Sequence, residues 1–216
     1  MNVEREKRAV AEAAAEYLVD GMTVGLGTGS TVAYLLPALA RRRLAIRCVA
    51  SSPRTEHAAR ELGLSVEPFG TVSQLDVTID GADQIAPDGW LIKGGGAAHT
   101  REKIVAAAGQ FVVIADSTKP VGALRPPIPL ELLAFGLSAT LCRLHPVALR
   151  DVPRSPDGGV IAGYQGAVGD PARLAARLSA TPGLVDHGLF PPELVAIVLI
   201  GHDDEVERRV LRSAAR

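Results

Sequence analysis

The sequence predicts an α/β protein with a Rossmann-like domain, whose sheet is mostly parallel, and a smaller inserted α/β domain of ferredoxin-like type. Three observations support this prediction. Short apolar runs alternate with helical patterns in the first half, prolines cluster after residue 119, and the run 194–200 is apolar throughout. Strands that alternate with helices are typical of a parallel sheet covered on both faces.

The first half contains the repeating strand and helix units. Residues 4–18 predict a helix, because Val10, Ala14 and Leu18 recur at helical spacing on one face, together with Ala13 and Tyr17. Buried strands are expected at 23–26, 46–50, 75–79 and 111–115, and further helices at 30–42, 54–62 and 99–108.

The character of the chain changes from Lys119 onward. Prolines at positions 120, 126, 127 and 129 mark a crossover into the second unit. Helices are expected at 130–144 and 170–180, with a loop at 150–159, a turn at 181–183 and a short surface helix at the end of the chain. The apolar run 194–200 is expected to rejoin the first sheet. The predicted domains are 1–124 with 195–216, and 125–194.

The composition narrows the possible partners and compartment. The 216 residues are 47% hydrophobic and carry 23 Lys and Arg against 24 Asp and Glu. A formal net charge of −1 gives no overall field to attract nucleic acid or an anionic membrane, so neither partner is expected. No apolar stretch reaches the ~18 residues of a membrane span, and the charged N-terminus lacks the pattern of a signal peptide.

The cysteines and histidines give no sign of a metal. Cys48 and Cys142 lack CxxC spacing, and the five histidines show no metal-binding pattern. We therefore expect no metal, no disulfide framework and a cytoplasmic location.

One short segment concentrates charged and flexible residues. Asp80 and Asp83 follow the strand expected at 75–79, and Lys93 precedes three glycines, Gly94 to Gly96. Ligands bind at the carboxyl ends of strands in open α/β sheets. Glu102 is expected in the first turn of the next helix. Aspartates that cap turns and glycines that form a bend are the simpler alternative, but the combination favours an active site.

A second glycine-rich segment joins a predicted strand to a helix at residues 24–31. Its backbone N–H groups can hold an anion at the helix N-terminus, which indicates phosphate binding. The dinucleotide fingerprint is incomplete because Ser30 replaces its third glycine, and no lysine follows as in a P-loop. Ser30 is either an N-cap or a direct ligand, and both roles are compatible.

Several blocks of the sequence together resemble ribose-5-phosphate isomerase of the A type. They are Gly27-Thr-Gly-Ser-Thr31, Asp80-Gly-Ala-Asp83, Leu91-Ile-Lys-Gly-Gly-Gly96, Thr100-Arg-Glu-Lys-Ile104, Ile114-Ala-Asp-Ser-Thr-Lys119 and Pro182-Gly-Leu-Val-Asp-His-Gly-Leu-Phe190. Their order and approximate spacing also match, so the resemblance covers nearly the whole chain.

The resemblance implies interconversion of ribose 5-phosphate and ribulose 5-phosphate through an enediolate, without metal or organic cofactor. It implies that Glu102 is the base and that Asp80, Asp83 and Lys93 handle ring opening and the enediolate. The implied substrate-binding residues are Lys7, Thr28, Gly29, Ser30, Thr31, Gly81, Ala82, Gly94, Gly95, Gly96 and Lys119. It also implies a homodimer or homotetramer that binds a small sugar phosphate.

The residue types fit this chemistry independently. One carboxylate can take a proton from one carbon and return it to its neighbour, and a cation can stabilise the oxyanion. Two alternatives stay open: a non-catalytic sugar-phosphate sensor of the same fold, and an enzyme for another sugar phosphate. The segment 161–166 stands at approximately the place of the family's usual Thr-Asp-Asn-Gly-Asn segment and departs from it, which concerns the loop of the second domain more than the chemistry.

Overall fold

The computed structural model describes residues 2–203 and 205–211, and it divides them into two compact units. The first contains the chain up to Ala82, Arg101–Lys119 and the chain from Pro192. The second contains Asp83–Thr100 and Pro120–Pro191. The predicted domain limits differ from these units mainly at 83–100, which groups with the second unit although it was assigned to the first domain. The domain limits themselves remain a prediction.

The first unit contains a seven-stranded sheet in the order β14-β13-β7-β4-β1-β2-β3. The strands are β1 (Thr23–Leu26), β2 (Arg47–Ala50), β3 (Ser65–Val66), β4 (Val77–Asp80), β7 (Gln110–Asp116), β13 (Val195–His202) and β14 (Glu205–Val210). All neighbouring pairs are parallel except β13 with β14. The predicted mostly parallel sheet is confirmed, and the run 194–200 does rejoin it.

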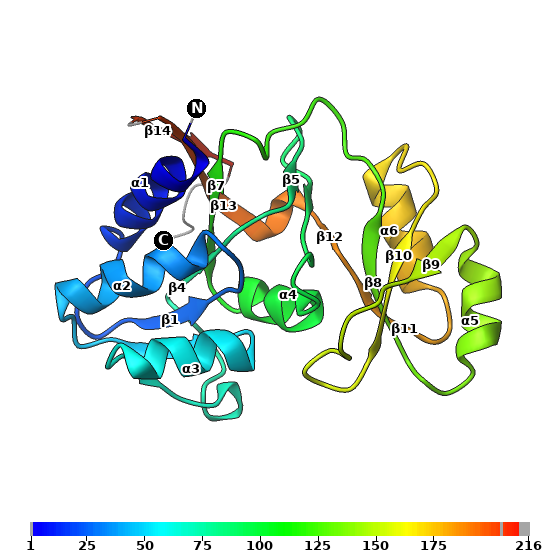
Figure 1. Ribbon diagram of the computed structural model, residues 1–216, viewed down its shortest axis with the longest axis horizontal. Coiled ribbons are helices and arrows are strands. Elements are labelled where there is room, and N and C mark those ends of the chain that lie inside the picture. The colour runs from blue at the N-terminus through cyan, green and yellow to red at the C-terminus, as the bar shows by residue number, and fades with distance from the viewer. Residues whose placement is uncertain (1, 204, 212–216) are drawn as a thin grey trace. The chain divides into compact units, whose positions relative to one another are not determined.

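Helices cover this sheet through apolar side chains. The helices of the repeating units are α1 (Val3–Ala15), α2 (Val32–Arg42), α3 (Pro53–Glu61) and α4 (His99–Ala107), with a short 3₁₀ helix at Phe69–Thr71. Helices α1 and α2 lie side by side (Figure 1), and their leucines and alanines share one core with β1, β4 and β7. Val105 of α4 packs in a separate cluster with Val49 and Leu75.

The second unit contains an antiparallel sheet in the order β11-β8-β10-β9 and a three-stranded sheet, β12-β6-β5. Its elements are β5 (Gln84–Ile85), β6 (Leu91–Ile92), β8 (Ile128–Leu132), α5 (Leu137–Leu144), β9 (Val147–Leu149), β10 (Val160–Tyr164), α6 (Pro171–Ser179), β11 (Leu184–His187) and β12 (Leu189–Phe190), with a 3₁₀ helix at Pro192–Leu194 before β13.

The chain order β8-α5-β9-β10-α6-β11 is the βαββαβ pattern of the ferredoxin-like fold, which confirms the predicted fold class. Helices α5 and α6 lie beside this sheet (Figure 1), and their leucines pack on buried residues of β8 and β10. The segment 161–166 falls largely in strand β10 rather than in a loop.

Two predicted helices are wrong. The helix expected at 130–144 is the end of strand β8 followed by the shorter α5, because Ile128–Leu132 is buried throughout and pairs with two strands. The surface helix expected at the end of the chain is strand β14, which pairs antiparallel with β13. Residues 204 and 212–216 of that prediction lie outside the described residues.

Candidate active site

Asp80 is the last residue of β4, at the carboxyl end where the sequence predicted a ligand site, and its side chain is buried. Its Oδ1 accepts hydrogen bonds from the N–H groups of Thr28 at 3.0 Å and of Gly81 at 2.7 Å. A Cβ on Gly27 would lie 1.8 Å from the Asp80 Cγ. Gly27 is therefore required because the carboxyl group occupies the space of its missing side chain.

The segment 27–31, here called the first glycine loop, is held by hydrogen bonds with hydroxyl groups of residues that follow strand β2. The Oγ1 of Thr28 lies 3.0 Å from the Ser51 hydroxyl, 2.7 Å from the Ser52 hydroxyl and 3.0 Å from that of Thr55. Thr55 also donates to the Gly27 carbonyl at 2.9 Å. The Thr28 side chain thus faces the protein, and because its N–H donates to Asp80, Thr28 shapes the loop through both its backbone and its hydroxyl.

The rest of the first glycine loop is open on its outer side. Gly29 has a φ of +146° with free space around its Cα, and both Gly29 and Ser30 are exposed. Helix α2 begins after Thr31, which is its N-cap residue and makes no side-chain capping bond. Ser30 is therefore not the N-cap, and its hydroxyl is placed at an exposed position.

Lys7 and Lys119 are the two predicted substrate-binding lysines of the first unit. They are close in sequence to Glu6 and Ser117, which are hydrogen-bonded to each other. The buried Glu6 carboxylate accepts from the N–H of Ser117 at 2.9 Å and from its hydroxyl at 2.8 Å. Burial alone would raise the pKa of Glu6, but the bonds from Ser117 and Asp203 outweigh it and lower the pKa. Glu6 therefore ties helix α1, which carries Lys7, to the segment that ends in Lys119.

Lys7 has a partner of its own. Its Nζ lies 3.1 Å from the Glu4 Oε1, and its side chain is 12% exposed. The pKa of Glu4 is lowered by a hydrogen bond from Tyr34 and by the bond from Lys7.

Glu102 lies in the first turn of α4, as predicted, and is only 3% exposed. A carboxylate in this position is favoured by the helix dipole. Charged groups are rarely buried unless they are paired or functional, so its burial is consistent with the predicted role as a base.

In the second unit, Asp83 contacts the segment 93–96, here called the second glycine loop. The Asp83 Oδ2 accepts from the N–H of Gly95 at 2.8 Å, and a Cβ on Gly95 would lie 2.9 Å from Oδ1. Gly94 has a φ of +109°, and a Cβ there would lie 2.9 Å from atoms of His99 and Pro129. These are conformational and steric reasons for glycine at both positions.

Lys93 is buried, with an exposure of 2%. Its backbone N–H donates to the Gly188 carbonyl at 2.9 Å, and its Nζ lies 5.4 Å from the centre of the Phe190 ring. A cation at this distance from an aromatic face is stabilised by the ring quadrupole. A lysine held in this way is pre-organised, unlike a lysine on the surface.

Two residues near the second glycine loop were missed by sequence reasoning. Arg150, which follows β9, donates from Nη1 to the Gly94 carbonyl at 3.0 Å and from Nη2 to the Gly95 carbonyl at 2.8 Å. Glu131 in β8 is 2% exposed and accepts from the hydroxyls of Thr100 and Ser155. A charged residue inside the apolar run 128–132 was the available signal for Glu131, whereas Arg150 stands in a polar loop without one.

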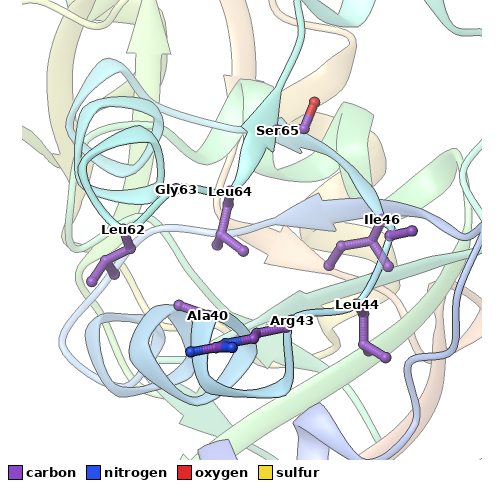
Figure 2. A pocket seen from close by; sticks show the side chains of 9 residues that line it. Ala40, Arg43, Leu44, Ile46, Leu62, Gly63, Leu64 and Ser65 are labelled. Atoms are coloured by element: carbon purple, nitrogen blue, oxygen red, sulfur yellow. The ribbon is translucent and has the colours of Figure 1, made fainter.

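The first unit also has a pocket that lies away from Asp80 and the first glycine loop. Figure 2 shows it between the ends of α2 and α3, where Leu44, Ile46, Leu62 and Leu64 surround a space of about 460 Å³ with Arg43 at its edge. These residues precede β2 and β3, at the amino ends of the strands. The pocket is therefore at the opposite edge of the sheet from Asp80.

Other kinds of site are not indicated among residues 2–203 and 205–211. No three His, Cys, Asp or Glu side chains there gather as metal ligands. In the same part of the chain, no helix has the length and apolar character needed to cross a membrane.

The comparisons with known proteins agree with the motifs. The family model described as ribose 5-phosphate isomerase A (phosphoriboisomerase A) matches residues 47–205. The chain belongs to the ribose 5-phosphate isomerase A family. A family member from Caulobacter sp. (strain K31), named ribose-5-phosphate isomerase A, is 43% identical over 226 aligned positions that cover 97% of this chain and 100% of the relative.

Solved structures of the ribose 5-phosphate isomerase A family give the same fold. The crystal structure of the protein from Neisseria gonorrhoeae has a TM-score of 0.92 at 29% identity, covering 98% of this chain and 99% of that one. A D-ribose-5-phosphate isomerase in complex with phospho-erythronic acid has a TM-score of 0.90 at 32% identity, covering 97% of this chain and 100% of the other.

Proposed function

We infer that this protein is an aldose–ketose isomerase that interconverts D-ribose 5-phosphate and D-ribulose 5-phosphate in the non-oxidative pentose phosphate pathway. The observation that carries this conclusion is the 43% identity over nearly the full length to a named ribose-5-phosphate isomerase A. The carboxylates and the buried lysine that the reaction needs are all present.

Glu102 is the proposed base. It takes the proton from C2 of the open-chain aldose, and the electron pair of that bond forms the C1–C2 double bond of an enediolate. As this double bond forms, the electron pair of the C1 carbonyl moves to O1. Return of the proton to C1 and transfer of the O2 proton to O1 then give the ketose, so the reaction is balanced without an external oxidant or reductant. A group that accepts from one carbon and donates to its neighbour acts as general base and then as general acid.

Lys93 is the proposed stabiliser of the negative charge on the enediolate oxygen. Loss of one pre-organised donor to an oxyanion typically raises a barrier by ~2.7 to 4 kcal/mol. Burial of Lys93 beside Phe190 supports this role, because a fixed cation needs no reorganisation when the charge develops.

Asp80 is proposed to move the proton between the ring oxygen and the anomeric hydroxyl during ring opening, with Asp83 in support. The hydrogen bonds that Asp80 accepts from the N–H groups of Thr28 and Gly81 fix the orientation of its carboxylate. Such hydrogen bonds favour the charged form of a carboxyl group, which is the form that accepts a proton.

The remaining predicted residues are proposed to hold the sugar phosphate. Thr28 to Thr31, Gly81, Ala82 and Gly94 to Gly96 form the loops proposed to bind it, in which the N–H groups of Thr28, Gly81 and Gly95 are bonded to Asp80 and Asp83. Lys7 and Lys119 offer positive charge. Binding energy from the phosphate, which is remote from the reacting carbons, can be used to orient the sugar. We further propose a cytoplasmic homodimer or homotetramer that requires no cofactor.

The test is conversion of ribose 5-phosphate to ribulose 5-phosphate by purified protein in EDTA, beside a Glu102→Gln variant. The variant preserves side-chain shape but removes the base, so we expect turnover to fall at least ~10²-fold. Retained turnover in the variant would remove Glu102 from its role. If the folded wild type binds the sugar phosphate without turnover, the proposed function changes from isomerase to sensor. If turnover occurs only with another sugar phosphate, the proposed substrate changes.

A further inference from the structure

Arg150 contacts the second glycine loop through both arms of its guanidinium group. Its two terminal nitrogens donate separately to two consecutive carbonyls, those of Gly94 and Gly95. Its own backbone N–H donates to the Ile161 carbonyl of β10 at 3.0 Å, which fixes the main chain from which the guanidinium extends. A planar guanidinium with two aligned donors holds two acceptors in a defined geometry, which lysine cannot do.

The peptide unit between Gly94 and Gly95 is held on both of its sides. Its carbonyl accepts from Arg150, and its N–H donates to the Asp83 carboxylate at 2.8 Å. Because the carbonyl and N–H of a trans peptide point in opposite directions, the cation and the anion grip opposite edges of the same plane. By the same geometry, the bond from Arg150 to the Gly95 carbonyl directs the N–H of Gly96 away from Arg150.

The loop that presents Arg150 is itself anchored. The Ser155 hydroxyl donates to the buried Glu131 carboxylate and accepts from the N–H of Gly159 at 2.9 Å. A Cβ on Gly159 would lie 2.3 Å from the Glu131 Oε1. The other oxygen of Glu131 accepts from Thr100, the second residue of α4. A shift of the loop at Ser155 or Gly159 would therefore break hydrogen bonds of the buried Glu131 carboxylate, which is costly.

We propose that Arg150 is a positioning residue for the second glycine loop: its guanidinium fixes the Gly94 and Gly95 carbonyls and so holds the loop in one backbone conformation for the sugar phosphate, with the Gly95 N–H bonded to Asp83 and the Gly96 N–H directed away from Arg150. The proposal rests on the proposed function, because it assigns the second glycine loop to the substrate. Arg150 itself acts through the loop and needs no contact with the sugar. A glycine loop without such a clamp would sample many backbone conformations, since glycine has the largest backbone freedom of any residue.

The experiment compares Arg150→Met with Arg154→Met. Arg154 stands in the same loop and donates to the Gly158 carbonyl at 2.9 Å, so it is a matched arginine that lacks the contact with the second glycine loop. We expect kcat/KM for ribose 5-phosphate to fall about 10²-fold in the Arg150 variant, as for a small misplacement of binding groups. Added guanidinium at millimolar concentration should restore part of the loss. The Arg154 variant should resemble the wild type.

The ¹⁵N-amide resonances of the glycines separate a positioning role from a general loss of structure. In Arg150→Met, the signals of Gly95 and Gly96 should shift while those of Gly158 and Gly159 remain in place, and Arg154→Met should show the reverse. Wild-type kcat/KM in Arg150→Met, or reduced kcat/KM with unshifted Gly95 and Gly96 signals, would overturn the proposal. If Arg150→Met does not fold, Arg150→Lys replaces it, and the same two outcomes decide.

The two readouts also separate this proposal from the proposed function. If the wild type does not convert ribose 5-phosphate but Gly95 and Gly96 still shift in Arg150→Met, the isomerase assignment fails and the clamp stands. If the wild type is active but the Gly95 and Gly96 signals do not shift in Arg150→Met, the isomerase assignment stands and the assignment of Arg150 is wrong.

Discussion

The two glycine loops are held in opposite ways. In the first, the backbone N–H of Thr28 donates to the Asp80 carboxylate, and hydroxyl groups hold the Thr28 side chain. In the second, backbone carbonyls accept from the Arg150 guanidinium. The first loop is organised around an anion and the second mainly around a cation.

The difference follows from topology. Strand β1 lies between β2 and β4 in a parallel sheet, so the residues that follow β1 and β2 and the last residue of β4 meet at one edge. The partners of Thr28 therefore come from the ends of the neighbouring strands: Asp80 ends β4, Ser51 and Ser52 follow β2, and Thr55 lies at the start of the next helix, α3. The second loop instead depends on a side chain about 55 residues further along the chain, in the antiparallel unit. A regular sheet makes the first arrangement predictable from sequence but not the second.

The largest expected effect is at Gly27. In Gly27→Ala the new methyl group would lie 1.8 Å from the Asp80 Cγ, so the carboxylate must leave the Thr28 N–H. We expect the free energy of unfolding to fall by about 1–3 kcal/mol, as for overpacking, and kcat/KM to fall about 10²-fold. Urea unfolding and steady-state kinetics measure the two quantities.

The matching change in the second loop is Gly95→Ala, where the contact is 2.9 Å to the end of the Asp83 side chain, and Gly70→Ala is the control with open space around it. The effects should decrease in the order Gly27, Gly95, Gly70. Equal effects at Gly27 and Gly70 would show that Asp80 does not require the close approach.

An intermediate effect is expected from acid. Because the folded-state pKa of Glu6 is lowered, its contribution to stability is present above its unfolded pKa of about 4.5 and is lost as pH falls through the folded value. The contact from Arg150 to the carbonyls involves a cation that stays charged throughout. In urea unfolding followed from neutral pH to about pH 3, Glu6→Gln should be less stable than wild type at neutral pH and lose less stability on acidification. An unchanged pH dependence in Glu6→Gln would place the acid sensitivity elsewhere.

The smallest effect concerns the two thiols, which report on the two units separately. Burial raises the pKa of Cys48 in β2 to about 12, whereas Cys142 in α5 is exposed. Because the thiolate is the reactive form, a thiol reagent should modify Cys142 rapidly and Cys48 only when the parallel sheet opens. In a Cys142→Ser background, Gly27→Ala should accelerate the labelling of Cys48 and Arg150→Met should not. Acceleration by both would mean that the two loops share one opening event.

Sequence reasoning located the helices and the longer strands of the first half because their apolar periodicity is local, but it missed the two-residue strands β3, β5 and β6. It failed at 130–144, where Pro129 and Glu131 argue against a strand although Ile128–Leu132 is buried between two partners. It failed again at β14, whose charged residues resemble a surface helix but form an edge strand. Asp80 and Glu102 were predictable from their places at a strand end and a helix start, whereas Arg150 is recognised only through pairing with Gly94 and Gly95.

The Glu131 carboxylate has a consequence for protein engineering. It is bonded at once to Thr100 and to Ser155, in the loop that presents Arg150. The sequence of the second glycine loop is therefore not sufficient to form its structure. In another scaffold its three glycines would have flexible backbones without the contacts that hold them in one conformation. To transfer the second glycine loop to another protein, strand β8 and loop 150–159 must be transferred together with it.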